Sequence, residues 1–176
     1  MPSLAPKEPA VPSKGFMLTG KDLKTLKGIE FPPGITTLDI SHNSLTNLIG
    51  CPSQITDLYC YDNELKDFTG APTGLILVDA HSNPIRSTKG LERCTQLKDV
   101  TMYMCELGEL GGHCEFPDSV EELNVAKNRI STIVSVPKAC KNLGITCNPL
   151  SEDCQDKSVD QLRELLANKL KMDDVE

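Results

Sequence analysis

The stretch Ile35-Thr36-Thr37-Leu38-Asp39-Ile40-Ser41-His42-Asn43-Ser44-Leu45 decides how this chain folds. Apolar residues stand at its first, fourth, sixth and eleventh places, and an asparagine stands at its ninth place. The pattern recurs along the chain with first places at Ile35, Ile55, Leu75, Leu97, Val120 and Cys140. These first places lie 20 to 23 residues apart, so the sequence predicts six copies of one structural unit.

Each copy predicts a short strand that ends in a turn. Alternate side chains of a strand face opposite ways, so the fourth and sixth places, such as Leu38 and Ile40, point into a core. The asparagine of the ninth place lies where the chain leaves the strand, and its amide can bond backbone groups that the turn leaves unpaired. In the fourth copy Cys105, a small residue with a weak donor, stands there instead. No single copy can bury its own apolar residues, so the copies must stack.

Over residues 16–150 this pattern resembles that of the leucine-rich-repeat family. In five copies a proline stands three residues before the first place, which favours extended rather than helical return segments: Pro32, Pro52, Pro72, Pro117 and Pro137. Short repeats with such prolines resemble those of bacterial secreted effectors and some protozoan proteins. The spacings of 22 and 23 residues are closer to a cytosolic 22-residue type. The resemblance implies an α/β solenoid with a parallel sheet on its concave face, and usually a protein-binding function.

We expect four segments along the chain. The first is a disordered, proline-rich leader, and the second is an atypical N-terminal capping repeat in which Phe16 and Leu18 stand 22 residues before Leu38 and Ile40. The third holds the six repeats, and the fourth is an acidic linker with a helix. Their bounds are 1–14, 15–34, 35–150 and 151–176.

The C-terminal segment carries a helix signature. Ser158 and Gln161 have the spacing of a capping box, and an apolar stripe at helical spacing runs from Val159 to Leu170. We expect this helix to cover the open end of the sheet, where the last strand would otherwise expose unpaired backbone. The alternative is a helix offered to a partner.

The composition excludes several classes of protein. A net charge of −7 and a pI near 5 argue against nucleic-acid binding, which needs a basic stripe, and no apolar run approaches the length of a membrane span. The N-terminus does not have the pattern of a secretory signal. We therefore expect a cytoplasmic monomer.

The eight cysteines are then expected to be reduced, with a C-terminal disulfide or an exported coat protein as alternatives. No CxxC pair occurs, so we expect no metal. Cys60 and Cys140 fall on inward places, and alkylation should first label the cysteines of the return segments, Cys51, Cys94 and Cys114.

No catalytic constellation is evident. Cys60 is expected to point inward and His81 outward, while His113 and Cys114 are neighbours with no orienting acid. No nucleophile elbow, P-loop or HExxH motif occurs. We therefore predict a protein that is not an enzyme and needs no cofactor.

The third, fifth and seventh places of each repeat are expected to face outward on the sheet. All three tyrosines of the chain fall on this face. We predict a partner-binding site with Tyr61, His81 and Tyr103 at its centre, because these three occupy the seventh place of consecutive repeats. The residues around them are Tyr59, Asp57, Asp79 and Asp99. The fifth and seventh places of the last two repeats carry Asn124, Ala126, Gly144 and Thr146, and this end of the face is predicted to lie outside the site.

These observations favour a non-catalytic adaptor or scaffold that binds a protein with a basic surface, complementary to the aspartates. The alternative is a regulatory subunit or secreted effector that acts on a cellular enzyme, with the C-terminal helix contributing contacts.

Overall fold

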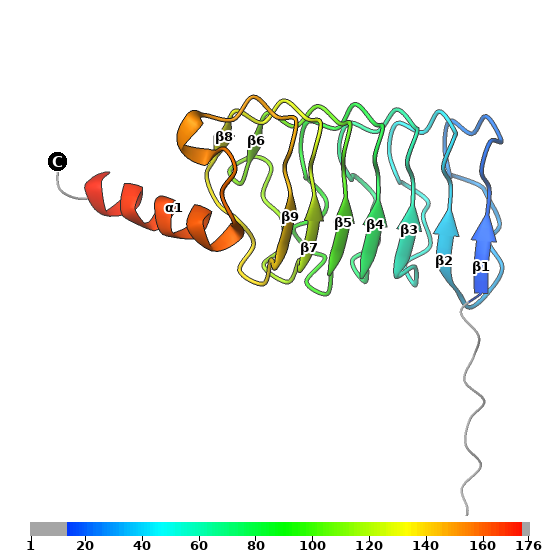
Figure 1. The fold of residues 1–176 in the computed structure, drawn as a ribbon. Helices are drawn as coiled ribbons and strands as arrows, with labels where there is room; N and C mark the ends of the chain where they lie inside the picture. The colour runs from blue at the N-terminus through cyan, green and yellow to red at the C-terminus, as the bar shows by residue number, and fades with distance from the viewer. Residues whose placement is uncertain (1–13, 174–176) are drawn as a thin grey trace, which may run out of the picture.

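The computed structural model describes residues 14–173, so the expected leader lies outside the described part except for its last residue. Successive coils of the chain place their strands side by side in one sheet, and a helix follows at the C-terminal end (Figure 1). Seven parallel strands form this sheet in the order β1-β2-β3-β4-β5-β7-β9. They are β1 (Lys14–Met17), β2 (Ile35–Asp39), β3 (Asp57–Tyr59), β4 (Leu77–Asp79), β5 (Asp99–Thr101), β7 (Glu122–Asn124) and β9 (Asn142–Gly144).

The register of the sheet follows the repeat pattern. Leu38 pairs with Leu58, and Leu58 pairs with Val78, so each fourth place stands beside the fourth place of the next repeat. Strand β1 joins in the same phase, with Phe16 beside Leu38. The predicted solenoid of stacked repeats with a parallel sheet is confirmed.

The core is a stack of aliphatic layers inside the coils. In the first five repeats, the side chains at places one, four, six and eleven are at most 2% exposed. The sixth repeat departs from this, because Leu143, Ile145 and Leu150 are only half-buried. The outermost coil therefore leaves apolar surface exposed, whereas the inner coils bury theirs against the next coil.

The asparagines of the ninth place form a hydrogen-bonded ladder between coils. Asn63 Oδ1 accepts the N–H of Leu45 from the preceding coil at 2.9 Å. Its Nδ2 donates to the carbonyls of Ile40 at 3.0 Å and Cys60 at 3.1 Å. Equivalent bonds are made by Asn43, Asn83, Asn128 and Asn148. The predicted role of this amide in satisfying turn backbone is confirmed.

The return segments contain a second repeat that the sequence analysis did not use. Gly50, Gly70 and Gly90 stand 20 residues apart, and each has positive φ. A Cβ on Gly70 would lie 2.4 Å from the backbone nitrogen of Ile49, and one on Gly90 would lie 2.3 Å from the carbonyl oxygen of Phe68. These positions require glycine both for the left-handed backbone and for the close approach of adjacent coils.

Two return segments contain short strands that the sequence did not predict. Strands β6 (Glu109–Leu110) and β8 (Thr132–Ile133) pair in parallel as a second, two-stranded sheet. The return between β5 and β7 belongs to the longest repeat, of 23 residues. Its extra residues let the backbone of two returns run close enough to pair.

The C-terminal segment forms the 3₁₀ helix η1 (Glu152–Cys154) and the helix α1 (Val159–Asp173). The capping box is present: the N–H of Gln161 donates to Ser158 Oγ at 3.3 Å, and the N–H of Ser158 donates to Gln161 Oε1 at 2.9 Å. Leu162 is buried. The side chain of Arg163 donates to the carbonyls of Pro137, Lys138 and Cys140 in the last return.

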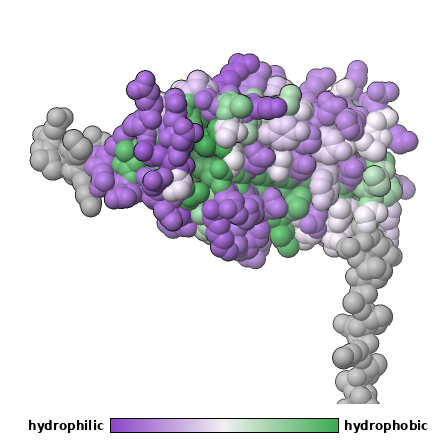
Figure 2. Space-filling model, in the orientation of Figure 1, coloured by the Kyte–Doolittle hydropathy of each residue, from purple (hydrophilic) through white to green (hydrophobic). Residues whose placement is uncertain are grey.

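The predicted capping helix is therefore confirmed, but the cap is partial. Leu165 and Leu166 of α1 are only half-buried. Figure 2 shows hydrophobic surface beside α1, at the end of the solenoid that this helix adjoins. Figure 1 shows α1 projecting away from the coils, so that only its first turns cover the last repeat.

The expected positions of Cys60 and Cys140 in the core are confirmed, since both are at most 2% exposed. The expectation that the cysteines of the return segments are the accessible ones is wrong for Cys94 and Cys114, while Cys51 is half-buried. Cys94 and Cys114 are as buried as Cys60, because the returns fold their side chains back over the core. The exposed cysteine is Cys147, at the end of the last strand.

Candidate functional site

The candidate site is the sheet face, defined here as the third, fifth and seventh places of the six repeats. This face carries five carboxylates and no lysine or arginine. The carboxylates are Asp39, Asp57, Asp79, Asp99 and Glu122. All charged residues at these places are therefore acidic, and each of the first five repeats contributes one of them.

The three residues predicted to form the centre of the site lie in one aromatic stack. The ring centroids of Tyr61 and His81 are 4.4 Å apart with an interplanar angle of 9°, and those of His81 and Tyr103 are 4.6 Å apart with an angle of 10°. His42 extends the row on the other side of Tyr61, at 5.1 Å and nearly perpendicular. The spacing of the rings follows that of adjacent strands, so the sheet itself holds the stack together.

The fourth predicted aromatic residue, Tyr59, lies outside this stack. It occupies the fifth place of its repeat, where it pairs in register with Asp39 on one side and Asp79 on the other. Its neighbours are carboxylates rather than rings.

Most carboxylates of the sheet face already have a protein partner. Asp79 Oδ1 accepts a hydrogen bond from His81 Nδ1 at 2.7 Å, which holds the imidazole in the stack. Asp57 Oδ2 accepts from the hydroxyl of Thr56 at 2.7 Å. Asp39, which was not among the predicted site residues, accepts from the buried Ser41 hydroxyl at 2.5 Å.

Asp99 differs from these carboxylates. Within residues 14–173 no donor is hydrogen-bonded to its side chain, and it stands in register beside Glu122. Burial, followed by the negative charges of Glu122 and Asp79, raises the pKa of Asp99. Glu122 has a single amide partner, Asn142, whose Nδ2 donates to it at 2.7 Å. The ionised form of Asp99 is therefore the least compensated charge of the sheet face.

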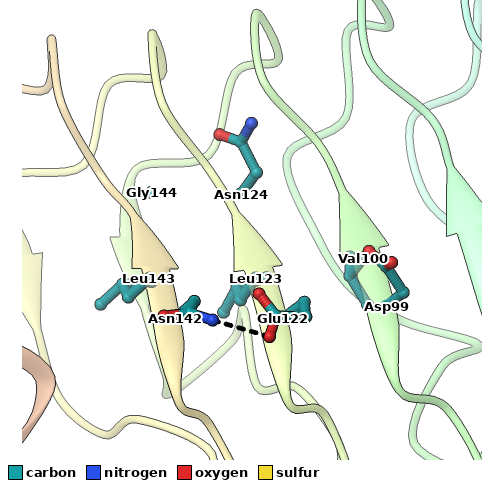
Figure 3. Close-up of a pocket in the computed structure, with 8 residues that line it drawn as sticks. All are labelled: Asp99, Val100, Glu122, Leu123, Asn124, Asn142, Leu143 and Gly144. Atoms are coloured by element: carbon teal, nitrogen blue, oxygen red, sulfur yellow. Dashed lines mark hydrogen bonds between the residues drawn. The ribbon is translucent and has the colours of Figure 1, made fainter.

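Asp99 and Glu122 border an open hollow of about 450 Å³ over β5, β7 and β9 (Figure 3). The hollow includes Gly144, which stands at a fifth place where the other repeats carry a side chain. This end of the face was predicted to lie outside the site. The glycine at the fifth place of the last repeat, one coil from Glu122, was the signal that could have revealed the hollow.

Several solved structures are similar to this chain, and two of them are described here. YopM from Yersinia enterocolitica WA-314 matches with a TM-score of 0.64 at 29% identity, over 78% of this chain and 30% of the YopM chain. A Shigella effector LRR domain matches with a TM-score of 0.51 at 23% identity, over 87% of this chain and 76% of that one. The chain is a leucine-rich-repeat solenoid. Its short repeats are of the bacterial-effector type, although the chain spans less than a third of YopM. No protein-family model and no curated protein matches it.

The solenoid offers no activated nucleophile at the place where His113 and Cys114 are neighbours. The Cys114 thiol is 2% exposed, and burial, with the charge of Glu109, raises its pKa. The side chain of Glu109 accepts the backbone N–H of His113 rather than a ring proton. Among the described residues, no group of three or more His, Cys, Asp or Glu side chains is placed to hold a metal ion. In the same part of the chain, no helix is long and apolar enough to span a membrane.

Proposed function

We propose that this solenoid is a non-catalytic protein-interaction module that binds a basic surface of a partner protein through the sheet face. The observation that carries the proposal is the stack of Tyr61, His81 and Tyr103 on a face with five carboxylates and no lysine or arginine. Tyrosines are common anchors of protein interfaces, because they bury a large area at a low cost in side-chain entropy. The carboxylates would then select partners by charge.

The stack is suited to binding because it is already ordered. Each ring is held by its neighbours, and Asp79 fixes the orientation of His81. Because these rings are already ordered, little of their side-chain entropy is lost when a partner covers them. More of the interaction energy therefore appears as affinity. The alternative origin of the tyrosines is the general preference of strands for this residue. That preference does not account for their absence from the return segments.

A position-specific cross-linking experiment tests which face binds. A photo-reactive amino acid at Thr101, on the sheet face between Asp79 and Asn124, should capture a partner from cell lysate. The same group at the exposed Arg93, on a return segment, should not. Capture at Thr101 should also be lost in a Tyr103→Ala background. Capture at Arg93 with none at Thr101 would move the binding site to the return side.

A second candidate function is a regulatory subunit or effector that acts on a cellular enzyme through α1. The specific observation is that Leu165 and Leu166 of α1 are only half-buried, as are Leu143, Ile145 and Leu150 of the last repeat. We expect either module to work in the cytoplasm as a monomer, where its eight cysteines remain reduced.

A further inference from the structure

The aromatic stack of the sheet face ends at Tyr103, and one face of the Tyr103 ring is not covered by another ring of the described residues. One face of the Tyr103 ring is covered by His81. On the other side the next coil presents Ala126, whose carbonyl accepts the N–H of Met104 at 3.1 Å and which therefore lies beside Tyr103. Within residues 14–173 no aromatic ring continues the stack past Tyr103. The uncovered face of the Tyr103 ring therefore borders a slot above the methyl group of Ala126. The slot is about one strand spacing wide, or roughly 4.8 Å.

The same end of the sheet face holds its least compensated carboxylates. Asp99 has no hydrogen-bond donor among the described residues, and its neighbour Glu122 has one. Both border the hollow over β5, β7 and β9 (Figure 3). A cation placed there would relieve the repulsion between the two carboxylates as well as pair with each of them.

The two features are separated by a distance that a peptide can match. Tyr103 follows Asp99 by four residues. Backbone pairing to the next coil continues from β5 through Met102, so the chain is extended from Asp99 to Met102, and it turns at Met104, whose φ is positive. At a rise of about 3.3 Å per residue, the ring and the carboxylate stand about 13 Å apart on one face. Side chains four residues apart in an extended peptide have the same separation and the same direction.

We propose that this end of the sheet face binds an extended, arginine-bearing segment of a partner protein at two points. The guanidinium of one arginine stacks on the open face of Tyr103 above Ala126, and a second cationic side chain four residues away enters the hollow and pairs with Asp99 and Glu122. This rests on the proposed function and names the partner chemistry of that site.

The first point selects arginine over lysine. A guanidinium is planar and weakly hydrated, and it stacks on an aromatic face, whereas an ammonium is a compact, strongly hydrated point charge. The second point requires only a positive charge. Lys127 follows Ala126 in sequence, and its positive charge opposes a cation in the slot. A cationic group bound there must therefore gain affinity by stacking on the ring rather than by charge alone.

The test uses peptides as probes against the full chain. An acetylated Gly-Ser peptide with two arginines four residues apart is titrated into the isotopically labelled protein, and amide shifts are followed by NMR. Its lysine counterpart and an isomer with the arginines two residues apart are compared. We expect the first peptide to bind about fivefold more tightly than either, with shifts centred on Asp99, Tyr103 and Ala126.

Substitutions separate the two points. Tyr103→Ala should lower the affinity for the arginine peptide to that for the lysine peptide. Tyr103→Phe should keep the preference for arginine over lysine. Asp99→Asn should weaken both peptides severalfold while raising the melting temperature, because it removes an uncompensated charge. Thr146→Ala, at the seventh place of the last repeat, is the matched control and should change neither affinity.

Equal affinities for the arginine and lysine peptides, or a preference for arginine that persists in Tyr103→Ala, would overturn the proposal. So would the absence of any shift at millimolar peptide. If the peptides fail while capture of a partner at Thr101 still depends on Tyr103, only this inference falls and the proposed function stands. If capture is also independent of Tyr103, both fall.

Discussion

At the scale of single residues, one departure from the repeat pattern has a structural consequence. In five repeats the asparagine of the ninth place bonds the N–H of place eleven in the preceding coil. In the fourth repeat Cys105 takes this place, and its sulfur lies 3.5 Å from the carbonyl oxygen of Ala80. The backbone N–H groups of Asn83 and Ile85 bond to this sulfur, which is a weaker acceptor than an amide oxygen. One step of the ladder is therefore weaker than the others.

We expect Cys105→Asn to raise the free energy of unfolding by about 1 kcal/mol, because an amide makes stronger hydrogen bonds than the thiol at this step. Asn63→Cys, which imposes the weaker arrangement on an intact step, should lower it by a similar amount. Urea denaturation of the two variants and the parent gives both values. A Cys105→Asn protein no more stable than the parent would show that sulfur serves this place as well as the amide.

At the scale of the elements, the strands and α1 could be predicted because each has a local signal. The strands follow from the spacing of apolar places such as Leu38 and Ile40, and the start of α1 from the capping box at Ser158. Strands β6 and β8 could not be predicted, because their pairing depends on how two returns of unequal length lie together. The partial cover of the last repeat likewise depends on the direction in which α1 leaves the coil.

The role of α1 as a cap can be tested by shortening the chain. A chain that ends at Leu150 loses the buried side chain of Leu162 and the bonds of Arg163 to the last return. We expect a loss of stability of at least about 2 kcal/mol, with aggregation through the uncovered repeat. Leu162→Ala should lose about 2 to 3 kcal/mol, and the exposed Asn168→Ala should lose little. An unchanged melting midpoint with retained solubility in the shortened chain would mean that α1 serves a partner instead.

At the scale of the whole molecule, the sheet brings residues 20 or more apart in sequence into one surface. The repeat register predicted that Tyr61, His81 and Tyr103 would lie in a row, because the same place of each coil must stack. It did not predict the hollow beside Asp99 and Glu122, because that depends on the missing side chain at Gly144. The repeat period therefore predicts features that every coil shares, such as the row of seventh places. It does not predict the hollow, which depends on a residue that differs between repeats.

The central claim is that the aromatic stack of the sheet face anchors a partner protein. The most direct measurement is the affinity of the partner captured through Thr101 for the parent chain and for Tyr61→Ala and Tyr103→Ala. Each substitution should cost about 2 kcal/mol or more, roughly a 30-fold loss of affinity, while Thr146→Ala should stay within about twofold. Circular dichroism melts establish that the variants remain folded. Tyrosine variants that stay folded and keep their affinity within about twofold would contradict the claim and place the binding site elsewhere.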